Sequence, residues 1–340
     1  MVKKILERPK AFWLGISIAV ILFIVWFLTR TFVMAPYSLP TTSMEKTIHM
    51  GGKVLVNKLN YLPISRGDIV VFHWPMGDTV IDLPDYQAMR PYYDVIRELG
   101  HGNADAGRQI LLADPNSYPL AIRPVSKQVV YLKRCIAIPG DTLEMRDEWV
   151  YIDGRRQAWP PEAETYFHVV TGGHPFDEGN MKTQYGLNIS NPEEIRALDS
   201  AGTYDMLLTW KAREKMLKDG FARRIDPDID SSTEGVFPND EVHHWTRDNL
   251  GPLWIPKKGA SMKLTPLNYP IYERIIRTYE GNTLEMHSGK IYVNGHEEGT
   301  YIFKMNYYWM IGDNLHGSQD SRYWGFVPED HLIGKASVTM

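Results

Sequence analysis

The chemistry that this 340-residue sequence can support begins with a serine. Ser43 lies in the stretch Pro40-Thr41-Thr42-Ser43-Met44, which is rich in hydroxyl groups. Since serine, threonine and proline are common in turns, these five residues alone favour a solvated linker. A serine hydroxyl becomes a useful nucleophile only when a nearby base takes its proton. A catalytic role for Ser43 therefore needs a base from elsewhere in the chain.

Lys133 is the candidate base. In the apolar stretch 128–137, strand alternation puts Lys133 in one row with Val129, Tyr131 and Cys135. Lysine ammonium groups usually extend to water, which favours a structural or edge-blocking role for such a lysine. If the amine is buried instead, desolvation lowers its pKa and leaves a neutral amine available near neutral pH. Lys133 could then activate Ser43 without any histidine.

Histidine and cysteine offer alternatives. A Ser-His-Asp triad could draw on His49, His73 or His316, but a lysine base makes a histidine unnecessary. Cys135 is the only cysteine, so no intrachain disulfide is possible, and its simplest role is that of a small buried residue. We therefore expect neither group to be the catalytic one.

No metal is expected. His243 and His244 follow Asp240 and Glu241, but adjacent residues on a strand point to opposite faces, and no third ligand with suitable spacing is evident. The net charge of -4 gives no electrostatic footprint for nucleic acid. These features exclude a nucleic-acid partner and disfavour a metal centre.

The N-terminal region reads as a membrane anchor. Ala11 to Thr29 contains 19 residues without a charge, and a helix of that length spans about 28 Å, close to the hydrocarbon thickness of a bilayer. We assign residues 1–10 to a cytoplasmic N-terminus and 11–33 to a transmembrane anchor, because the basic residues Lys3, Lys4 and Arg8 precede it. The alternative is a cleaved signal peptide, whose cut after Ala35 would be hindered by Pro36.

Short β-branched and aromatic stretches divided by Asp-Gly and Asn-Gly turns predict a mainly β, antiparallel core. We expect a catalytic core in two parts, 34–159 and 267–340, with insertions at 76–126 and 160–266, the second being an α+β cap lobe. Helices are expected at Pro91–Leu99, from Asn191 onward and at Asp205–Asp219. The predicted strands are Lys53–Lys58, Asp68–Phe72, Gln128–Ala137, Trp149–Asp153, Lys290–Asn294, Asn306–Ile311 and Gly334–Val338.

One segment of the sequence recurs. Residues 140–154 resemble residues 281–295 at an offset of 141, which predicts two similar β-hairpins and leaves a duplication possible. The same offset places Arg274 opposite Lys133. A second copy would therefore lack the lysine.

Taken in chain order, the motifs resemble type I signal peptidases, which are bacterial membrane enzymes with a serine–lysine dyad. The resemblance covers most of the chain outside the insertions. It rests on 40–44, on Arg66-Gly-Asp-Ile-Val-Val-Phe72, on Tyr131-Leu-Lys133-Arg134 followed by Ile138-Pro-Gly-Asp141, and on Gly312-Asp-Asn314 with Ser318-Gln-Asp-Ser-Arg-Tyr-Trp-Gly325.

The resemblance implies a role for each matching residue. Ser43 would be the nucleophile and Lys133 the general base, with the Thr41 hydroxyl and the Ser43 amide forming the oxyanion hole. Ser318 would orient the lysine amine. The supporting polar network would consist of Asp313, Asp320, Arg322 and Arg134, the last as the charge partner of Asp313, and the substrate cleft would be lined by Met44 and Tyr131.

The resemblance also implies the setting. It predicts a single-pass enzyme of the bacterial cytoplasmic (inner) membrane, with its catalytic domain on the outer (periplasmic or extracytoplasmic) face. It would need no cofactor, would act near the protein export machinery at the phospholipid bilayer, and would cut the signal peptides of exported preproteins after small residues. A substrate would bind extended beside a strand edge.

Two departures keep alternatives open. Leu315 stands where the family has arginine after Gly-Asp-Asn, and Gly317 stands where asparagine is frequent. These changes favour a catalytically weakened, membrane-tethered binding or assembly module. A self-cleaving serine–lysine protease of the repressor type is a second alternative, disfavoured by the anchor and by the absence of a DNA-binding segment.

Overall fold

The computed structural model describes residues 10–29, 33–58, 63–75, 77, 79–83, 92–171, 177–198, 202–297 and 299–339. The basic residues Lys3, Lys4 and Arg8, used above to orient the anchor, lie outside this part of the chain. So does Pro91, the expected first residue of a helix.

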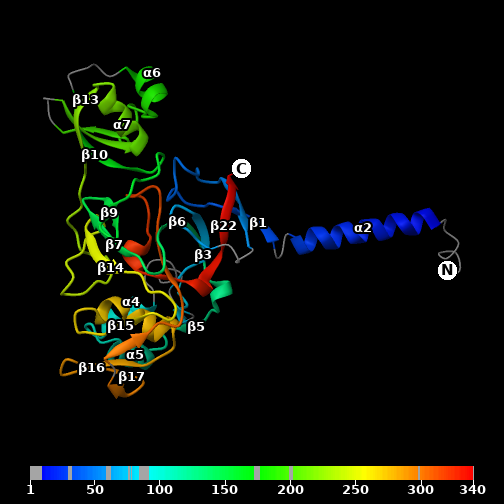
Figure 1. Ribbon diagram of the computed structural model, residues 1–340, viewed down its shortest axis with the longest axis vertical. Helices are drawn as coiled ribbons and strands as arrows, with labels where there is room; N and C mark the ends of the chain where they lie inside the picture. Colours follow the sequence, from blue (N-terminus) through cyan, green and yellow to red (C-terminus); the bar gives the residue numbers. More distant parts are fainter. Residues whose placement is uncertain are drawn as a thin grey trace.

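A seven-stranded sheet forms the centre of the molecule (Figure 1). Every neighbouring pair in it is antiparallel, which confirms the predicted mainly β, antiparallel core. Its strands, in spatial order, are β1 (Met34–Ser38), β2 (Lys53–Asn57), β22 (Leu332–Thr339), β3 (Ile69–His73), β6 (Val130–Ala137), β20 (Tyr307–Ile311) and β21 (Val327–Pro328).

The order of these strands joins the N-terminal and C-terminal parts of the chain in one sheet. β22, from the C-terminal end of the described chain, pairs with β2 and β3 from the N-terminal part. β20 pairs with β6, so Ile311 lies opposite Arg134, next to Lys133. Val70 on β3 pairs with Lys133 from the other side. Lys133 is therefore held in the interior of the sheet rather than at an edge.

Two hairpins with the same register confirm the internal repeat. β7 (Thr142–Arg146) pairs with β8 (Trp149–Ile152), and β16 (Leu284–His287) pairs with β17 (Lys290–Val293). Each cross-strand pair of the first hairpin recurs 141 residues later in the second. The likeness does not extend to Lys133, because Arg274 lies on helix α8 (Tyr269–Arg274) and not on a strand. The sequence offset that aligns Arg274 with Lys133 therefore does not make the two residues structural equivalents.

A second sheet forms the cap lobe, drawn at the top of Figure 1. Its order is β11 (Ile195–Ala197), β12 (Thr203–Thr209), β10 (Glu164–Thr171) and β13 (Ala222–Pro227). Helix α7 (Trp210–Lys218) packs beside it, capped by the Thr209 side chain, which accepts the Ala212 N–H.

Of two helix predictions in this lobe, one was wrong and the other is confirmed only in its second part. Asn191 begins no helix, because its side chain and carbonyl close a turn and the chain then pairs with β12 from Ile195. Asp205–Asp219 is a helix only from Trp210, because the residues before it gain strand partners on both sides in β10 and β11. In both places the hydrogen bonds offered by a neighbouring strand overrode a local helical pattern.

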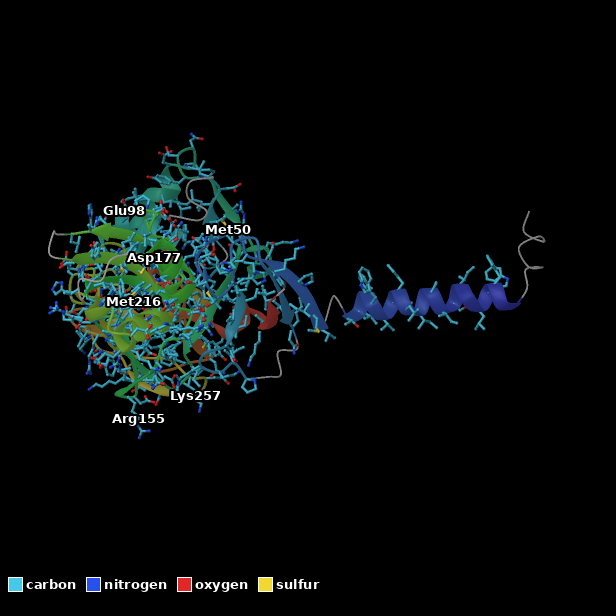
Figure 2. All side chains as sticks on the ribbon, turned by 90° about the horizontal axis from the view of Figure 1, so that it is seen from above. Met50, Glu98, Arg155, Asp177, Met216 and Lys257 are labelled. Atoms are coloured by element: carbon cyan, nitrogen blue, oxygen red, sulfur yellow. The ribbon has the colours of Figure 1, made fainter. Side chains whose placement is uncertain are left out.

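The N-terminal helix α2 (Lys10–Leu28) extends away from the body (Figures 1 and 2). Its side chains from Phe12 to Leu28 are exposed. Within the described residues, no helix meets the combined length and apolarity needed to cross a membrane.

The remaining elements complete the body around the two sheets. β14 (Leu250–Trp254) and β9 (Arg155–Arg156) flank the first hairpin, and β18 (His296–Glu297) extends the second. Helix α4 (Tyr92–Leu99) confirms the prediction at Pro91–Leu99 apart from its first residue. The other elements are β4 (Thr79–Ile81), α5 (Ala104–Ala113), β5 (Leu120–Ile122), η2 (Val125–Lys127), α6 (Glu178–Asn180), η3 (Met181–Tyr185), β15 (Ser261–Lys263), η4 (Ile275–Tyr279), β19 (Thr300–Ile302), α9 (Ser321–Trp324) and η5 (Glu329–His331).

Candidate active site

Ser43 lies in the turn between β1 and β2, where it is buried with 4% of its surface exposed. Its hydroxyl is 3.1 Å from the hydroxyl of Thr41. Its carbonyl accepts the Asn314 N–H at 3.1 Å, which ties the turn to the segment after β20. The Ser43 N–H has no acceptor among the described residues. One amide and one hydroxyl are thus positioned beside the serine oxygen.

Lys133 is buried, with 2% of its surface exposed, so the alternative in which its amine extends to water was wrong. It lies in the row of Tyr131 and Cys135, flanked by the buried side chains of Val70 and Phe72. Burial lowers the pKa of Lys133 from its ordinary value of 10.5 to about 8. Near neutral pH the amine can therefore lose its proton far more readily than a surface lysine.

The charges around Lys133 oppose one another. The carboxylates of Asp320 and Asp313 raise its pKa, while the Arg322 guanidinium lowers it further. Among the described residues, no hydrogen bond joins the Lys133 amine to the Ser43 hydroxyl, whose partner is Thr41. Hydrogen bonds of a catalytic pair are often formed only when substrate binds.

Asp313 is held by a residue of strand β6 and by a residue of the turn between β1 and β2. The guanidinium of Arg134 donates to both of its oxygens at 2.7 and 2.5 Å, and the Thr47 hydroxyl donates at 2.6 Å. The ion pair expected between Arg134 and Asp313 is present and shielded from water, since no surface of Asp313 is exposed. It anchors the segment after β20 to β6, beside Lys133.

Asp320 and Arg322 form a second ion pair with no exposed surface. Arg322 donates to both oxygens of Asp320 at 2.8 and 2.9 Å, and the Gly312 N–H adds a third bond at 3.1 Å. Burial would raise the pKa of Asp320, but Arg322, with help from Lys133, holds that pKa below its ordinary value. Asp320 therefore remains a carboxylate beside the lysine.

Ser318 lies at the same point of the fold. Its hydroxyl is buried and lies near the Asp320 carboxylate, whose pKa it helps to lower. A β-carbon added to Gly312 would lie 2.3 Å from that hydroxyl and 2.4 Å from the Ser43 carbonyl oxygen. Ser43 and Ser318 therefore approach each other across the backbone of Gly312, and any side chain at this position would collide with both.

Gly312→Ala is expected to lower activity strongly and to destabilise the fold by about 1–3 kcal/mol, because the new methyl group must displace Ser43 or Ser318. Kinetics and urea unfolding of the purified variant would measure both effects. Gly179→Ala, whose added carbon would be 3.4 Å from its nearest neighbour, is the matched control. An alanine at position 312 with parental activity would contradict this account.

The structure also brings in charged residues that the sequence motifs did not indicate. Arg247 reaches the segment after β20, with its guanidinium 3.0 Å from His316 Nδ1. His316 Nε2 is 3.6 Å from the buried carboxylate of Glu148. Burial, together with nearby Asp248, raises the pKa of Glu148 to about 8. These contacts join residues far apart in the chain, so no local pattern could have predicted them.

The two departures from the family pattern have structural explanations. Leu315 is buried in the largest apolar cluster, with 1% of its surface exposed. Arg247 supplies a guanidinium to the same segment from another part of the chain. Gly317 packs against the Asn314 side chain, which accepts the Gly317 N–H. The segment is therefore fixed although Leu315 carries no charge.

The two residues expected to line a substrate cleft differ in position. Tyr131 is partly buried and contacts Trp324 edge-on, with a ring-centre distance of 5.0 Å. Met44 has no exposed surface, and its sulfur accepts the Asp313 N–H at 3.4 Å. Contact of Met44 with a substrate remains a prediction.

The alternative catalytic groups are engaged elsewhere. Burial lowers the pKa of His316 to about 3, which makes it a poor base. His49 pairs with Glu45, and His73 Nδ1 lies 3.3 Å from the Gln128 carbonyl oxygen. Burial raises the pKa of the Cys135 thiol, so a thiolate is disfavoured. None of these groups competes with Lys133 as the base.

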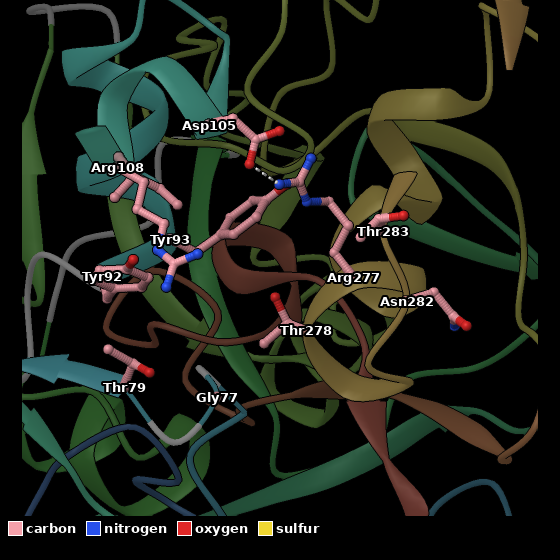
Figure 3. Close-up of a pocket in the computed structure, with 11 residues that line it drawn as sticks. Gly77, Thr79, Tyr92, Tyr93, Asp105, Arg108, Arg277, Thr278, Asn282 and Thr283 are labelled. Atoms are coloured by element: carbon pink, nitrogen blue, oxygen red, sulfur yellow. Dashed lines mark hydrogen bonds and ion pairs between the residues drawn. The ribbon is translucent and has the colours of Figure 1, made fainter. Parts of the chain in front are cut away.

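Two further features lie away from Ser43. In the cap lobe, His168, Asp205 and Asp228 are the group of three described residues close enough to share a metal, but carboxylates face both nitrogens of the histidine ring at 2.6 and 3.2 Å. A cavity of about 360 Å³ lies between α4, α5 and η4, where Asp105 pairs with Arg277 (Figure 3). None of the expected catalytic residues lines that cavity.

The sequence matches the model of a known protein family. The sequence model of the family described as signal peptidase, peptidase S26, matches residues 12–184 and 297–340, more than half of the chain. The unmatched stretch between them includes most of the cap lobe after β10 and the second hairpin.

Individual relatives carry the same name. Signal peptidase I of Buchnera aphidicola subsp. Acyrthosiphon pisum is 40% identical over 325 residues, which cover 93% of this chain and 70% of the relative. Signal peptidase I of Buchnera aphidicola subsp. Schizaphis graminum is 20% identical over 339 residues, covering 98% and 77%. Signal peptidase IB of Staphylococcus aureus strain COL is 23% identical over 244 residues, covering 71% and 87%.

Proposed function

The chain belongs to the signal peptidase family, peptidase S26, and we propose that it removes N-terminal signal peptides from exported preproteins with Ser43 as nucleophile and Lys133 as general base. The observation that carries this proposal is the burial of Lys133 at the same end of β20 as the Ser43 turn. A buried amine with a lowered pKa is suited to take a proton from a serine hydroxyl.

The reaction would proceed in two stages. Lys133 takes the proton of the Ser43 hydroxyl as the oxygen attacks the carbonyl carbon at the cleavage site, after a small residue. Thr41 and the Ser43 N–H stabilise the negative oxygen that forms. When the C–N bond breaks, the ammonium of Lys133 returns its proton to the leaving amine. Lys133 then takes a proton from water as its oxygen bonds to the acyl carbon. The ester bond to Ser43 breaks, the signal peptide leaves with a new carboxyl group, and the Lys133 ammonium returns its proton to the Ser43 oxygen.

The other polar residues act through Lys133 or through the backbone. We assign to Ser318 the orientation of the amine, because its buried hydroxyl lies across Gly312 from Ser43. Asp313 with Arg134 and Asp320 with Arg322 fix the segment after β20 and keep charge near the lysine balanced. The chemistry assigned to these residues requires no cofactor.

Incubation of the detergent-solubilised full chain with a purified preprotein tests the proposal. We expect one cut at the signal-peptide junction, identified by N-terminal sequencing of the product. The rate should rise with pH through about 8, because only the neutral form of Lys133 accepts the serine proton. Failure to cut any preprotein, or a rate that falls as the pH rises through 8, would contradict the assignment.

Membrane attachment is part of the same proposal. The exposed side chains of α2 are apolar apart from Ser17, whose hydroxyl donates to the Trp13 carbonyl. Met50, 62% exposed in the turn after Ser43, lies in the half of the body nearer to α2 (Figure 2). We propose that this segment holds the enzyme at the outer face of the cytoplasmic membrane, with the N-terminus inside and near the export machinery.

Extraction of bacterial membranes with alkaline carbonate measures this attachment. The full chain is expected to remain with the lipid, whereas a chain starting at residue 34 should be released while retaining its fold. Replacing both Leu22 and Ile24 of α2 by lysine should also release the protein, and these changes leave the body of the protein untouched. Release of the full parental chain would disprove the attachment.

A further inference from the structure

An acidic pocket of about 460 Å³ opens beside Ser43. It lies between the cap lobe and the turn that joins β1 to β2 and carries Ser43, which we call the catalytic turn. Thr42 and Asn314 line it on the catalytic side, and the cap lobe contributes Glu164, Glu193 and Glu194. A fourth carboxylate, Glu45, comes from the catalytic turn, while Lys46 is the one lysine or arginine among the described residues of its lining. The pocket therefore carries an excess of negative charge.

The backbone fixes Glu164 close to the nucleophile. Its N–H donates to the Asp313 carbonyl at 2.8 Å, and its carbonyl accepts the Leu315 N–H at 2.9 Å. Between these two residues, Asn314 pairs with Glu164 as an isolated parallel bridge and donates its own N–H to the Ser43 carbonyl. Asn314 therefore links the first residue of β10, Glu164, to the carbonyl of Ser43.

The side chain of Glu164 lacks the partner that a buried carboxylate needs. Only 1% of Glu164 is exposed, and its Oε2 has no hydrogen-bond partner among the described residues. Its pKa is raised to about 7, mainly by burial and also by Glu45 and Glu194, against the opposing effect of Lys46. A cation placed here would relieve the cost of this unpaired group.

The other carboxylates of the pocket differ in whether they already have hydrogen-bond or ion-pair partners. Glu194 accepts the Asn188 N–H at 2.8 Å and the Asn191 side chain at 3.3 Å, and Glu45 pairs with His49. Glu193 lies exposed on the rim, where its carbonyl accepts the Tyr166 hydroxyl at 2.8 Å. Glu164 inside and Glu193 at the entrance are therefore the groups best placed to receive a ligand.

We propose that this pocket is a substrate subsite that takes a lysine or arginine side chain of the preprotein close to the scissile bond. The inference rests on the proposed function, since it assumes that a peptide lies against Ser43. In an extended peptide each residue advances about 3.3 Å, so only residues within about three positions of the cut can reach a pocket beside the nucleophile. An ammonium or guanidinium there would make charge-assisted hydrogen bonds to Glu164.

Cleavage of a peptide series by the full chain in detergent tests the subsite. Each position within three residues of the cut carries, in turn, lysine or its neutral analogue norleucine. At one position we expect lysine to raise kcat/KM about 10-fold over norleucine, the size of one charge-assisted contact. This ratio should fall towards one in Glu164→Gln and decrease in Glu193→Gln, an exposed change that spares the core.

Two further variants sharpen the result. Glu162→Gln alters a cap-lobe carboxylate that pairs with Lys211 outside the pocket, and it should leave the ratio unchanged. Lys46→Gln should increase the ratio, because it removes the competing positive charge from the pocket.

The possible outcomes separate the two proposals. Efficient cleavage with equal rates for lysine and norleucine at every position would overturn the subsite while leaving the peptidase function intact. A lysine preference that survives in both Glu164→Gln and Glu193→Gln would also overturn it. Failure to cleave any peptide or preprotein would instead count against the proposed function itself.

Discussion

Ser43→Ala is expected to lower kcat/KM for preprotein cleavage by at least about 10⁴-fold while the protein remains folded. The serine oxygen is the atom that bonds to the substrate in the proposed mechanism, and neither Thr41 nor Lys133 can replace it. Removal of the hydroxyl costs the fold only its contact with Thr41 at 3.1 Å, so the unfolding midpoint should change little. Preprotein cleavage, followed by gel electrophoresis, measures the effect.

The matched control is Ser38→Ala on strand β1. Ser38 is exposed and lies five residues before the nucleophile, so its hydroxyl can be removed without touching the site. Parental activity in Ser38→Ala together with inactivity in Ser43→Ala would assign the chemistry to one hydroxyl. Substantial cleavage by Ser43→Ala would exclude Ser43 as the nucleophile and leave the Lys133 burial without a catalytic explanation.

The central sheet could be predicted from the sequence because its signals are local. Strands such as β2 alternate buried and partly exposed residues, and the turns after Asp153 and Asn294 use the side chains of those residues to hold each hairpin. The two residues proposed as catalytic lie in such local contexts, Ser43 in a proline- and threonine-rich turn and Lys133 in a β-branched strand. Residue type alone favoured a linker and a structural lysine there, and it was the resemblance of several such stretches, in chain order, to a known family that indicated both residues.

The cap lobe was harder to predict because its strands depend on distant partners. The residues of β12 gain hydrogen bonds from β10 and β11, and Met206 and Leu208 alternate into the core, so a segment expected to be helical becomes a strand. Glu164 and Arg247 reach the site for the same reason. A tertiary contact places each of them, and neither belongs to a motif.

Lys133→Met is expected to reduce kcat by at least about 10⁴-fold at every pH, since methionine fills the space but cannot accept the serine proton. The methionine side chain is unbranched and similar in length to lysine, so it should pack in the apolar row of Tyr131 and Cys135 without disturbing it. The two carboxylates nearby keep their own partners, Arg322 for Asp320 and Arg134 for Asp313. Lys257→Met, at an exposed position, is the control.

The same variant has a second expected effect, on stability. In the folded parent the pKa of Lys133 is about 8, against 10.5 for an ordinary lysine, so below pH 8 folding must bury an ammonium at a cost of about 3 kcal/mol. Between pH 8 and 10.5 the folded state releases this proton before the unfolded state does, and the cost is relieved as the pH rises. Lys133→Met should therefore be more stable than the parent below pH 8, by up to that amount, and the difference should shrink towards pH 10.5.

Urea unfolding of parent and variant from pH 7 to 10.5 measures this difference in the free energy of unfolding. Lys257→Met, which removes an exposed lysine, is the control and should show no such pH dependence. A general base that must be uncharged to act is stabilised in that form by the same burial that makes its ammonium costly. Loss of activity with a constant stability difference across this pH range would mean that Lys133 is not held as the proposed mechanism requires. Loss of activity with the expected convergence would tie the catalytic base to the buried amine.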